Sequence, residues 1–318
     1  MVKLIVMIPA FNEEGVIANV IRNIPRNVSS IKSVEVLVMD DKSTDNTVKV
    51  SKNAGADYVI TNEVNQGLGQ NFKKGINHAL RLGADIIVNI DADGQFNSKD
   101  IPKLIQPILN KEADVVTCSR FIDPSIVKNM PFRRKIGNLL FANIINRITG
   151  RSLTDVSCGF RAYSREAALR LNLFGSFTYT HESIIDLTNK NMRISEIALP
   201  VVYFEERRSL ISGNLISYGV RSLNIMIRAT RDTQPLSFFG RPALLLLFIG
   251  LIGIAFSFGY WLIYHATTPV RFLFQVSVFL AVFGISLGIL ALLADMLKTI
   301  KMNQEEMIYR MKKGEYGG

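Results

Sequence analysis

The chain has 318 residues and a formal net charge of +10, so it can form one soluble domain of about 230 residues and a smaller second part. The positive charge fits three kinds of anionic partner: nucleic acid, an anionic membrane surface or a phosphorylated substrate. Cys118 and Cys158 are the only cysteines. Their separation excludes a cysteine metal motif and argues against a disulfide framework, which fits a reducing, cytosolic compartment.

Strand-like and helix-like segments alternate along the first 120 residues. The apolar run 2–10 is followed at once by Asn12, Glu13 and Glu14 without a small-residue cleavage site, so we expect a strand and not a signal peptide. The alternation predicts an α/β fold, with a mostly parallel sheet and helices on both faces. The predicted strands are 3–9, 34–39, 57–61, 85–90 and 114–118, and the predicted helices are 14–24, 44–54, 68–82 and 101–110.

Residues 121–240 have a less regular pattern. A basic cluster at 133–135 opens a helical pattern that extends to residue 147, and 154–165 has the composition of a loop with a short strand. Beyond this loop the sequence predicts a helix at 182–190 and a strand at 197–204.

Two later runs, 243–265 and 272–294, contain no Asp, Glu, Lys or Arg. Each has 23 residues, and a helix of that length spans roughly 34 Å, enough to cross the core of a bilayer. The alternative is a pair of buried core helices, but charge-free runs of this length are hard to explain in a core. Before them, 214–231 has apolar residues at helical spacing between arginines, which predicts an amphipathic helix in the membrane interface.

Basic residues flank the two apolar runs, whereas the connecting loop 265–271 has a single Arg. Because Lys and Arg concentrate on the cytosolic side of membranes, we expect a multi-pass membrane protein with the large domain and both termini in the cytosol. Their position near the spans favours lipid phosphate over nucleic acid as the anionic partner. These residues are Arg221, Arg228, Arg231, Arg241, Lys298, Lys301, Arg310, Lys312 and Lys313.

Polar residues follow several predicted strands where the strands end, which is the edge at which parallel α/β sheets bind ligands. Asp91 and Asp93 stand one residue apart after an apolar strand. Carboxylates so placed can hold Mg²⁺ or Mn²⁺ that bridges two phosphates, and Gln95 can add an oxygen ligand. By itself, however, an Asp-x-Asp tripeptide is also typical of a turn.

Other polar motifs keep two interpretations each. Asp41 can accept a hydrogen bond from a nucleotide base, or it can cap the helix that starts near Thr44. The glycine-containing turn 65–69 can lie near phosphates or be a simple turn. Arginines outside the predicted strands can bind phosphate or form a solvated basic face. They are Arg120, Arg133, Arg134, Arg161, Arg207 and Arg208.

Five segments in this order carry a family resemblance: MIPAFNEE, VLVMDDKSTDNT, NQGLG, NIDADGQ and DVSCGFRAYSREA. Together they resemble the family 2 glycosyltransferases of the GT-A fold. More narrowly, the chain is similar to the polyprenyl-phosphate glycosyltransferases, a group that includes dolichol-phosphate mannose synthases, and to their branch with two C-terminal transmembrane helices. The resemblance of the soluble part covers residues 3–205.

The resemblance implies roles for the matching residues on the donor side. The nucleotide pocket contains Pro9, Phe11 and Glu13, Asp41 reads the base, and Asp91, Asp93 and Gln95 surround the metal and the donor diphosphate.

The resemblance also implies the acceptor side. Gly137 stands where the family often has Ser, and the loop 207–210 lacks the family's Lys, for which Arg208 can substitute. Arg120 lies near both phosphates, Asp155 and Arg161 flank the reaction centre, Arg133 and Arg134 grip the lipid phosphate, and Arg207 and Arg208 lie on a closing loop.

The expected reaction follows from the acceptor's charge. A phosphate monoester is largely a dianion at neutral pH, so it needs orientation by arginines more than a strong base. A metal would stabilise the leaving nucleoside diphosphate, and a single displacement inverts the anomeric centre. Asp155 and Glu182 are candidates for a base or a sugar-hydroxyl acceptor, whereas His181 alone is more typical of a packed histidine.

We therefore predict transfer of a hexosyl group from a nucleotide sugar to polyprenyl or dolichyl phosphate, with UDP-glucose favoured and GDP-mannose next. One alternative is a non-processive transferase for another membrane lipid, and another is a non-catalytic, membrane-tethered nucleotide-binding scaffold. Processive synthases carry a Gln-x-x-Arg-Trp element, but Trp261 is the only Trp and lies inside the first apolar run.

Four parts are expected along the chain. They are a GT-A domain at 1–210, an interfacial helix at 211–240, two transmembrane helices within 241–297 and a basic cytosolic tail at 298–318. Because two spans make a thin membrane domain, we also expect a homo-oligomer, and the resemblance makes a tetramer one candidate.

Overall fold

The computed structural model describes residues 2–123, 125, 127–128, 130, 132–173, 179–202, 227, 231–232 and 234–316, with the backbone alone at 128 and 132–134. The chain forms two compact units. Met1–Tyr218 and Ile308–Gly318 make the first, and Gly219–Met307 makes the second. Apart from Ile227 and Arg231, the predicted interfacial helix at 214–231 lies outside the described residues, as do Arg207 and Arg208.

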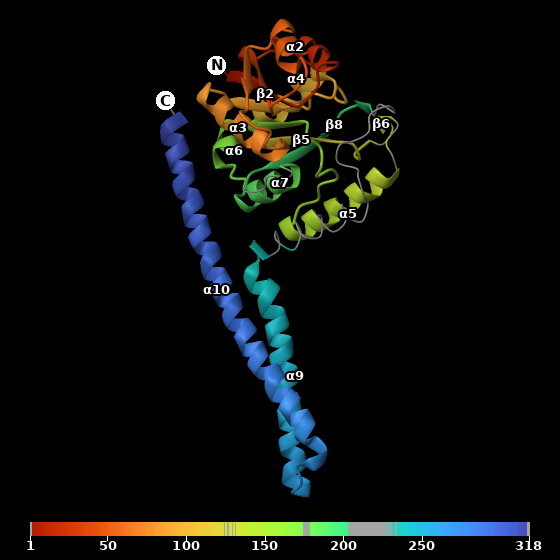
Figure 1. Cartoon of the computed structure of the whole chain (residues 1–318), viewed down its shortest axis with the longest axis vertical. Coiled ribbons are helices and arrows are strands. Elements are labelled where there is room, and N and C mark those ends of the chain that lie inside the picture. Colours follow the sequence, from red (N-terminus) through yellow and green to blue (C-terminus); the bar gives the residue numbers. More distant parts are fainter. Residues whose placement is uncertain are drawn as a thin grey trace. The chain divides into compact units, whose positions relative to one another are not determined.

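A seven-stranded sheet organises the first unit (Figure 1), in the order β3-β2-β1-β4-β7-β5-β8. β7 is antiparallel to both of its neighbours, and the other pairs are parallel. The strands are β1 (Val2–Ala10), β2 (Ile31–Asp40), β3 (Tyr58–Thr61), β4 (Ile86–Asn89), β5 (Val115–Ser119), β7 (Arg161–Ser164) and β8 (Ile194–Ala198). A smaller sheet pairs β6 (Val127–Lys128) with β9 (Val201–Val202). The predicted mostly parallel α/β sheet is confirmed.

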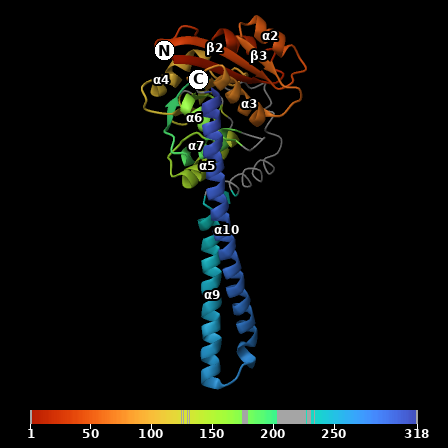
Figure 2. The same ribbon diagram turned by 90° about the vertical axis from the view of Figure 1, so that its left-hand side faces the viewer.

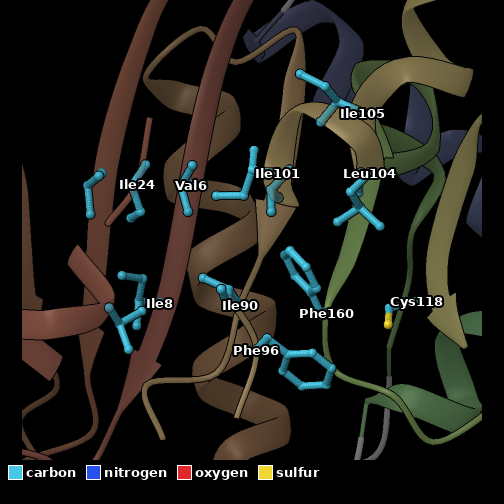
Figure 3. Packing of buried hydrophobic residues seen from close by; sticks show 14 of the residues in the cluster. Val6, Ile8, Ile24, Ile90, Phe96, Ile101, Leu104, Ile105, Cys118 and Phe160 are labelled. Carbon is cyan, nitrogen blue, oxygen red and sulfur yellow. The ribbon is translucent and has the colours of Figure 1, made fainter. Parts of the chain in front are cut away.

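Helices cover both faces of this sheet, so its central strands are apolar on both sides. Leu4, Val6 and Ile8 of β1 pack in one cluster, and Ile5 and Met7 pack in the other. Figure 3 shows part of the first cluster, where β1 faces α4. On the first face lie α1 (Ile17–Arg22), α2 (Thr47–Asn53) and α4 (Ile101–Leu109), and on the second lie α3 (Leu68–Arg81), α6 (Arg165–Arg170) and α7 (Thr180–Asn189).

The remaining helical elements of this unit are short or border the sheet. The 3-10 turn η1 (Ser98–Asp100) leads into α4, and α5 (Phe132–Thr149) contacts α7. The helical pattern predicted after the basic cluster at 133–135 is therefore confirmed.

Two helices begin later than the sequence predicts, for one shared reason. α1 starts at Ile17 and not at residue 14, and α2 starts at Thr47 and not at residue 44. The intervening residues form hydrogen bonds between the two loops. For example, the Thr44 amide donates to Asn12 Oδ1 at 2.8 Å, and the Asn46 amide donates to Glu14 Oε2 at 2.8 Å. These tertiary bonds replace the first turns of both helices.

The described part of the strand predicted at 197–204 comprises the end of β8 and all of β9, and residues 203–204 lie outside the described residues. β8 ends at Ala198 and β9 begins at Val201, with Pro200 between them. Proline has no amide proton for a sheet ladder, so the break is expected at that residue.

The second unit contains two long apolar helices that lie side by side (Figures 1 and 2). α9 (Pro235–Tyr264) and α10 (Arg271–Tyr316) are joined by the 3-10 turn η3 (Thr268–Val270). Both are long and apolar enough to cross a membrane, and 17% and 22% of their most apolar windows are buried. This low burial is unlike that of a soluble core helix, so a membrane protein is the consistent interpretation.

α9 and α10 approach each other closely at glycine. A Cβ at Gly250 would lie 2.6 Å from the Ala281 amide nitrogen, and one at Gly284 would lie 2.7 Å from the Leu247 amide nitrogen. Only glycine fits these positions without displacing the partner backbone, a contact that is common between membrane helices.

The last residues of α10 pack with the first unit. Tyr309 and Tyr316 are buried in the second hydrophobic cluster. The Tyr309 hydroxyl donates to Glu166 Oε1 at 2.9 Å, and the Arg170 guanidinium lies 4.1 Å from the centre of the Tyr309 ring. Residues 308–316, predicted only as part of a basic tail, are thus helical and attached to α6.

Candidate active site

The polar motifs meet at one edge of the sheet because of the strand register. Ala10 pairs with Asp40, and Met7 pairs with Asn89, so the loops after β1, β2 and β4 leave the sheet together. β7 begins at the same edge, where Arg161 pairs with both Asn89 and Thr117. Segments distant in sequence therefore surround the end of β4.

The loop after β1 is fixed by the loop after β2. Asn12 has a positive φ of 55°, and its amide donates to Ser43 Oγ at 2.9 Å. The Glu13 amide donates to Thr47 Oγ1 at 2.8 Å. Pro9 is buried at the end of β1, whereas the Phe11 ring is exposed at this edge. The hydrogen bonds between the two loops thus fix the segment that contains Phe11, and its place in a nucleotide pocket stays a prediction.

Asp41 is buried and organises the loop before α3. Its carboxylate accepts hydrogen bonds from the amides of Gln66 and Gly67, at 2.9 and 2.8 Å, and from Asn62 Nδ2 at 2.8 Å. A carboxylate has about four acceptor positions, and these hydrogen bonds use three of them. Asn62 and Gln66, which both donate to Asp41, also line an open cavity of about 490 Å³ between β3 and α3.

Asp91 follows β4 and lacks a hydrogen-bond donor among the described residues. Burial raises the pKa of its carboxyl to about 7, with a further contribution from the charge of Asp93. Arg120 and Arg161 act in the opposite direction, but they do not offset the burial. Two neighbouring carboxylates, one of which has a pKa raised by burial, are a pair whose charge a bound cation would neutralise.

Asp93 lies in a tight turn that also contains Gln95. The Gln95 amide donates to Asp93 Oδ1 at 3.0 Å, and Gly94 between them has a φ of +72°. The Gln95 carbonyl accepts from the Val202 amide at 3.1 Å. This turn brings the side chains of three predicted metal-site residues to the end of one strand.

The residues present fit a divalent cation held jointly with a ligand. Two carboxylates and an amide oxygen suit Mg²⁺ or Mn²⁺, which usually take their remaining oxygens from water and substrate phosphates. The described residues hold no group of three or more His, Cys, Asp or Glu side chains that could bind a metal. Asp91 and Asp93 would therefore share the ion with phosphate oxygens.

Arg120 and Asp155 form a buried, two-point ion pair. Arg120 Nε lies 2.5 Å from Asp155 Oδ2, and Arg120 Nη2 lies 2.9 Å from Oδ1. Asn138 Nδ2 donates to the same carboxylate at 3.1 Å. Burial raises the pKa of Asp155, but the hydrogen bonds and charge of Arg120 and the Ser157 amide together outweigh it, so the pKa lies below its usual value. Asp155 is therefore ionised and occupied.

Arg161 is fully buried and cross-links the elements around the site. It donates to the Thr180 carbonyl at 2.7 Å, to Ser183 Oγ at 2.8 Å and to the Val156 carbonyl at 2.9 Å. With no exposed surface, its guanidinium acts on the site through its charge, which lowers the pKa of Asp91.

The other predicted residues are placed less completely. Glu182 lies in the first turn of α7. Arg133 and Arg134 lie in the first turn of α5, where only the backbone is described. Arg207 and Arg208 lie outside the described residues, so their contact with an acceptor stays a prediction.

Sequence reasoning missed three residues around Asp91. Asn89 is a polar residue inside an apolar strand, which is a signal that was available in the sequence. Gly159 belongs to one of the five segments of the family resemblance, but the contacts of Gly159 and Tyr179 around Asp91 join distant segments and had no local signal.

Comparison with solved structures supports the fold. Glucosyl-3-phosphoglycerate synthase from Mycobacterium tuberculosis, in complex with Mn²⁺, UDP-glucose and phosphoglyceric acid, aligns with a TM-score of 0.55 and 23% identity, over 72% of this chain and 78% of that one. The chain therefore shares the GT-A fold of that structure.

Sequence comparison then gives the family. Residues 5–171 match the model for glycosyl transferase family 2. The chain is 34% identical over 234 residues to UDP-N-acetylglucosamine--dolichyl-phosphate N-acetylglucosaminyltransferase of Methanococcus voltae, across 68% of this chain and 91% of that protein. It is 29% identical to polyprenol monophosphomannose synthase of Mycolicibacterium smegmatis, across 63% and 77%. The chain belongs to glycosyl transferase family 2, as predicted.

Proposed function

We propose that the protein transfers a hexosyl group, with inversion, from a nucleotide sugar to polyprenyl or dolichyl phosphate. The observation that carries this proposal is the pair Asp91 and Asp93 at the end of β4, facing the charges of Arg120 and Arg161. Such a site suits a diphosphate leaving group and an anionic acceptor. The relatives of Methanococcus voltae and Mycolicibacterium smegmatis, whose names contain a polyprenol or its phosphate, support the acceptor class.

The chain's own residues would bind and orient both substrates. Phe11 and Asp41 would bind the base. Arg120, positioned by its ion pair with Asp155, would bind the phosphates. A Mg²⁺ or Mn²⁺ ion on Asp91 and Asp93, with Gln95 nearby, would supply charge neutralisation for the departing diphosphate. The lipid phosphate is already a dianion near pH 7, so its oxygen can attack the anomeric carbon without a strong base.

Asp155 and Glu182 take different roles in this proposal. Because the Asp155 carboxylate accepts from Arg120 and Asn138, it would position Arg120. Glu182 would accept a hydrogen bond from a sugar hydroxyl. Arg133, Arg134, Arg207 and Arg208 would hold the acceptor phosphate, whose charge they match.

The donor is proposed as a UDP-linked hexose. UDP-glucose is the sugar nucleotide in the Mycobacterium tuberculosis structure, and UDP-N-acetylglucosamine is named in the relative with 34% identity. A mannose donor is the second candidate, because the Mycolicibacterium smegmatis relative is a monophosphomannose synthase.

The membrane helices would keep the enzyme with a substrate that cannot leave the bilayer. The basic residues at both flanks of α9 and α10 favour a cytosolic position for the first unit and for both termini. A homo-oligomer, with a tetramer as one candidate, is part of the proposal, and mass measurement in detergent tests it.

A transfer assay tests the function. Purified protein in detergent receives a short polyprenyl phosphate, Mn²⁺ or Mg²⁺, and in turn UDP-glucose, UDP-N-acetylglucosamine and GDP-mannose. We expect nucleoside diphosphate release that requires metal and lipid, and an Asp93→Asn variant that loses more than about 100-fold in turnover. The exposed Glu112→Gln is the matched control. Turnover with another lipid alone would refute the acceptor, and full activity of Asp93→Asn would refute the proposed site.

A further inference from the structure

The Asp91 carboxylate occupies the space that a side chain at residue 159 would take. A Cβ added to Gly159 would lie 2.5 Å from Asp91 Oδ2 and 2.9 Å from Oδ1. Gly159 is not among the glycines with positive φ. Its backbone conformation therefore does not require glycine, whereas the space for Asp91 does.

The Tyr179 hydroxyl borders the same space. The position of that added Cβ is also 2.9 Å from Tyr179 Oη. Both the Asp91 carboxylate and the phenol oxygen are thus within 3 Å of one point beside Gly159. Gly159 consequently leaves the space that the Asp91 carboxylate fills, and the Tyr179 hydroxyl lies at the border of that space.

Tyr179 is held rigidly from two directions. Its ring stacks on Phe72 with a centroid distance of 3.9 Å and an interplanar angle of 8°, and the side chain is 1% exposed. Asn89 Nδ2 donates to Tyr179 Oη at 2.8 Å and to the Gly159 carbonyl at 2.8 Å. Asn89 therefore ties the tyrosine to the strand that leads into Asp91.

The Tyr179 hydroxyl accepts one hydrogen bond and keeps its own proton available to donate. Because Tyr179 Oη accepts from Asn89, its own O–H remains to be donated, and the described chain shows no other partner for it. Asp91 is the neighbouring acid across Gly159. A donor on one side of a metal-binding carboxylate fixes which oxygen faces the ion.

We propose that Tyr179, supported by Asn89 and enabled by Gly159, is a positioning residue that orients the Asp91 carboxylate for the divalent cation. This inference rests on the metal role in the proposed function. Supporting residues of this kind usually change metal affinity by 10–100-fold, so a metal-binding measurement tests it without reference to turnover.

The test uses the full-length protein in detergent and titrates Mn²⁺ by calorimetry in the presence of UDP. Tyr179→Phe keeps the ring on Phe72 and removes the hydroxyl, and we expect Mn²⁺ affinity to fall by about 10-fold with an unchanged melting temperature. Tyr163→Phe is the matched control, because Tyr163 is also fully buried in the same cluster and its hydroxyl lacks a hydrogen bond. That variant should bind Mn²⁺ like the wild type.

Gly159→Ala provides a second variant through steric displacement of Asp91, and we expect a larger loss of Mn²⁺ affinity. Should Gly159→Ala fail to fold, Tyr179→Phe still decides the question. Wild-type affinity in Tyr179→Phe overturns the inference. A wild-type protein that binds no Mn²⁺ overturns both the inference and the metal role, whereas the expected affinities without transfer to lipid phosphate sustain the inference and refute the acceptor.

Discussion

Arg120 and Asp155 hold each other through both carboxylate oxygens, and Glu196 fixes the loop on which Asp155 lies. Glu196 Oε1 accepts from the Asp155 amide at 2.8 Å, and Oε2 accepts from the Thr154 amide at 2.7 Å. The Asp155 side chain has no exposed surface, and that of Arg120 has 13%. Asp155, itself fixed by Glu196, thus holds the Arg120 side chain in one position.

Asp155→Asn removes the charge that holds Arg120 and leaves the side chain's size unchanged. Because a buried arginine then loses its partner, we expect a destabilisation of about 3 kcal/mol and a 10- to 100-fold loss of kcat/KM. Thermal unfolding and steady-state kinetics measure both effects in one preparation.

A double-mutant cycle with Arg120→Ala distinguishes positioning from base catalysis. If Asp155 acts through Arg120, Asp155→Asn adds little to the loss already caused by Arg120→Ala. Independent, multiplicative losses in the double variant would contradict this account and restore Asp155 as a base.

Asp91→Asn tests the raised pKa of Asp91. The pKa of this carboxyl is raised to about 7 in the folded protein, so folding favours its protonated form. The resulting contribution to the free energy of unfolding is fully present below the unfolded pKa near 4 and is lost as the pH rises to about 7. In EDTA at pH 8 we therefore expect Asp91→Asn to be more stable than the wild type by on the order of 2 kcal/mol.

When metal is added, the wild type should become more stable than Asp91→Asn, which reverses their order in EDTA. Mn²⁺ with UDP binds the ionised wild-type site and raises its melting temperature, whereas Asp91→Asn gains little. Melting curves at pH 5 and pH 8, with EDTA or Mn²⁺, give the comparison. Equal stability of both proteins at pH 8 in EDTA would show that the pKa of Asp91 is not raised in the folded protein.

Much of the sheet could be predicted because its strands are apolar runs bounded by turns. The residues of β1 from Leu4 to Ile8 contribute alternately to the two cores, so the run 3–9 identifies a buried strand by composition alone. The helix starts near 14 and 44 could not be predicted in the same way. They depend on hydrogen bonds between Asn12 and Thr44 and between Glu14 and Asn46, which join segments about 30 residues apart.

The site was predictable where a motif is contiguous and not where it is assembled by the fold. Asp91 and Asp93 are recognisable from their spacing and the strand before them. By contrast, Gly159 stands in a recognisable segment, but only the structure places it against Asp91. The family resemblance placed Arg120 and Asp155 near the reaction centre, but their mutual ion pair is a tertiary contact that no local pattern encodes.

His181 is predicted to reduce stability in acid. Both ring nitrogens are buried without a hydrogen-bond partner, and the ring lies 4.9 Å from that of Phe141. Burial, helped by the charge of Arg161, lowers the pKa of His181 to about 4. The contribution of the neutral ring to the free energy of unfolding is fully present above the unfolded pKa near 6.5. It is lost as the pH falls toward 4, which lowers the free energy of unfolding by about 3 kcal/mol.

His181→Leu removes this titration while keeping an apolar side chain against Phe141. Between pH 7 and pH 4.5 we expect the wild type to lose more stability than the variant, and chemical unfolding at several pH values measures the difference. Parallel pH profiles for the two proteins would mean that His181 is not buried as a neutral ring.

Tyr309 connects the end of α10 to α6 and is predicted to stabilise the first unit. Tyr309→Ala removes the ring beneath Arg170 and the hydrogen bond to Glu166, so we expect a loss of about 2–4 kcal/mol and a melting temperature lower by roughly 5 °C or more. Tyr309→Phe keeps the ring and removes the hydrogen bonds with Glu166 and Lys313, and it should cost about 1 kcal/mol. Met311→Ala is the control, because Met311 is on the same helix and 73% exposed. If Met311→Ala lowered the melting temperature as much as Tyr309→Ala, the contact of Tyr309 with Arg170 and Glu166 would not be what stabilises the end of α10.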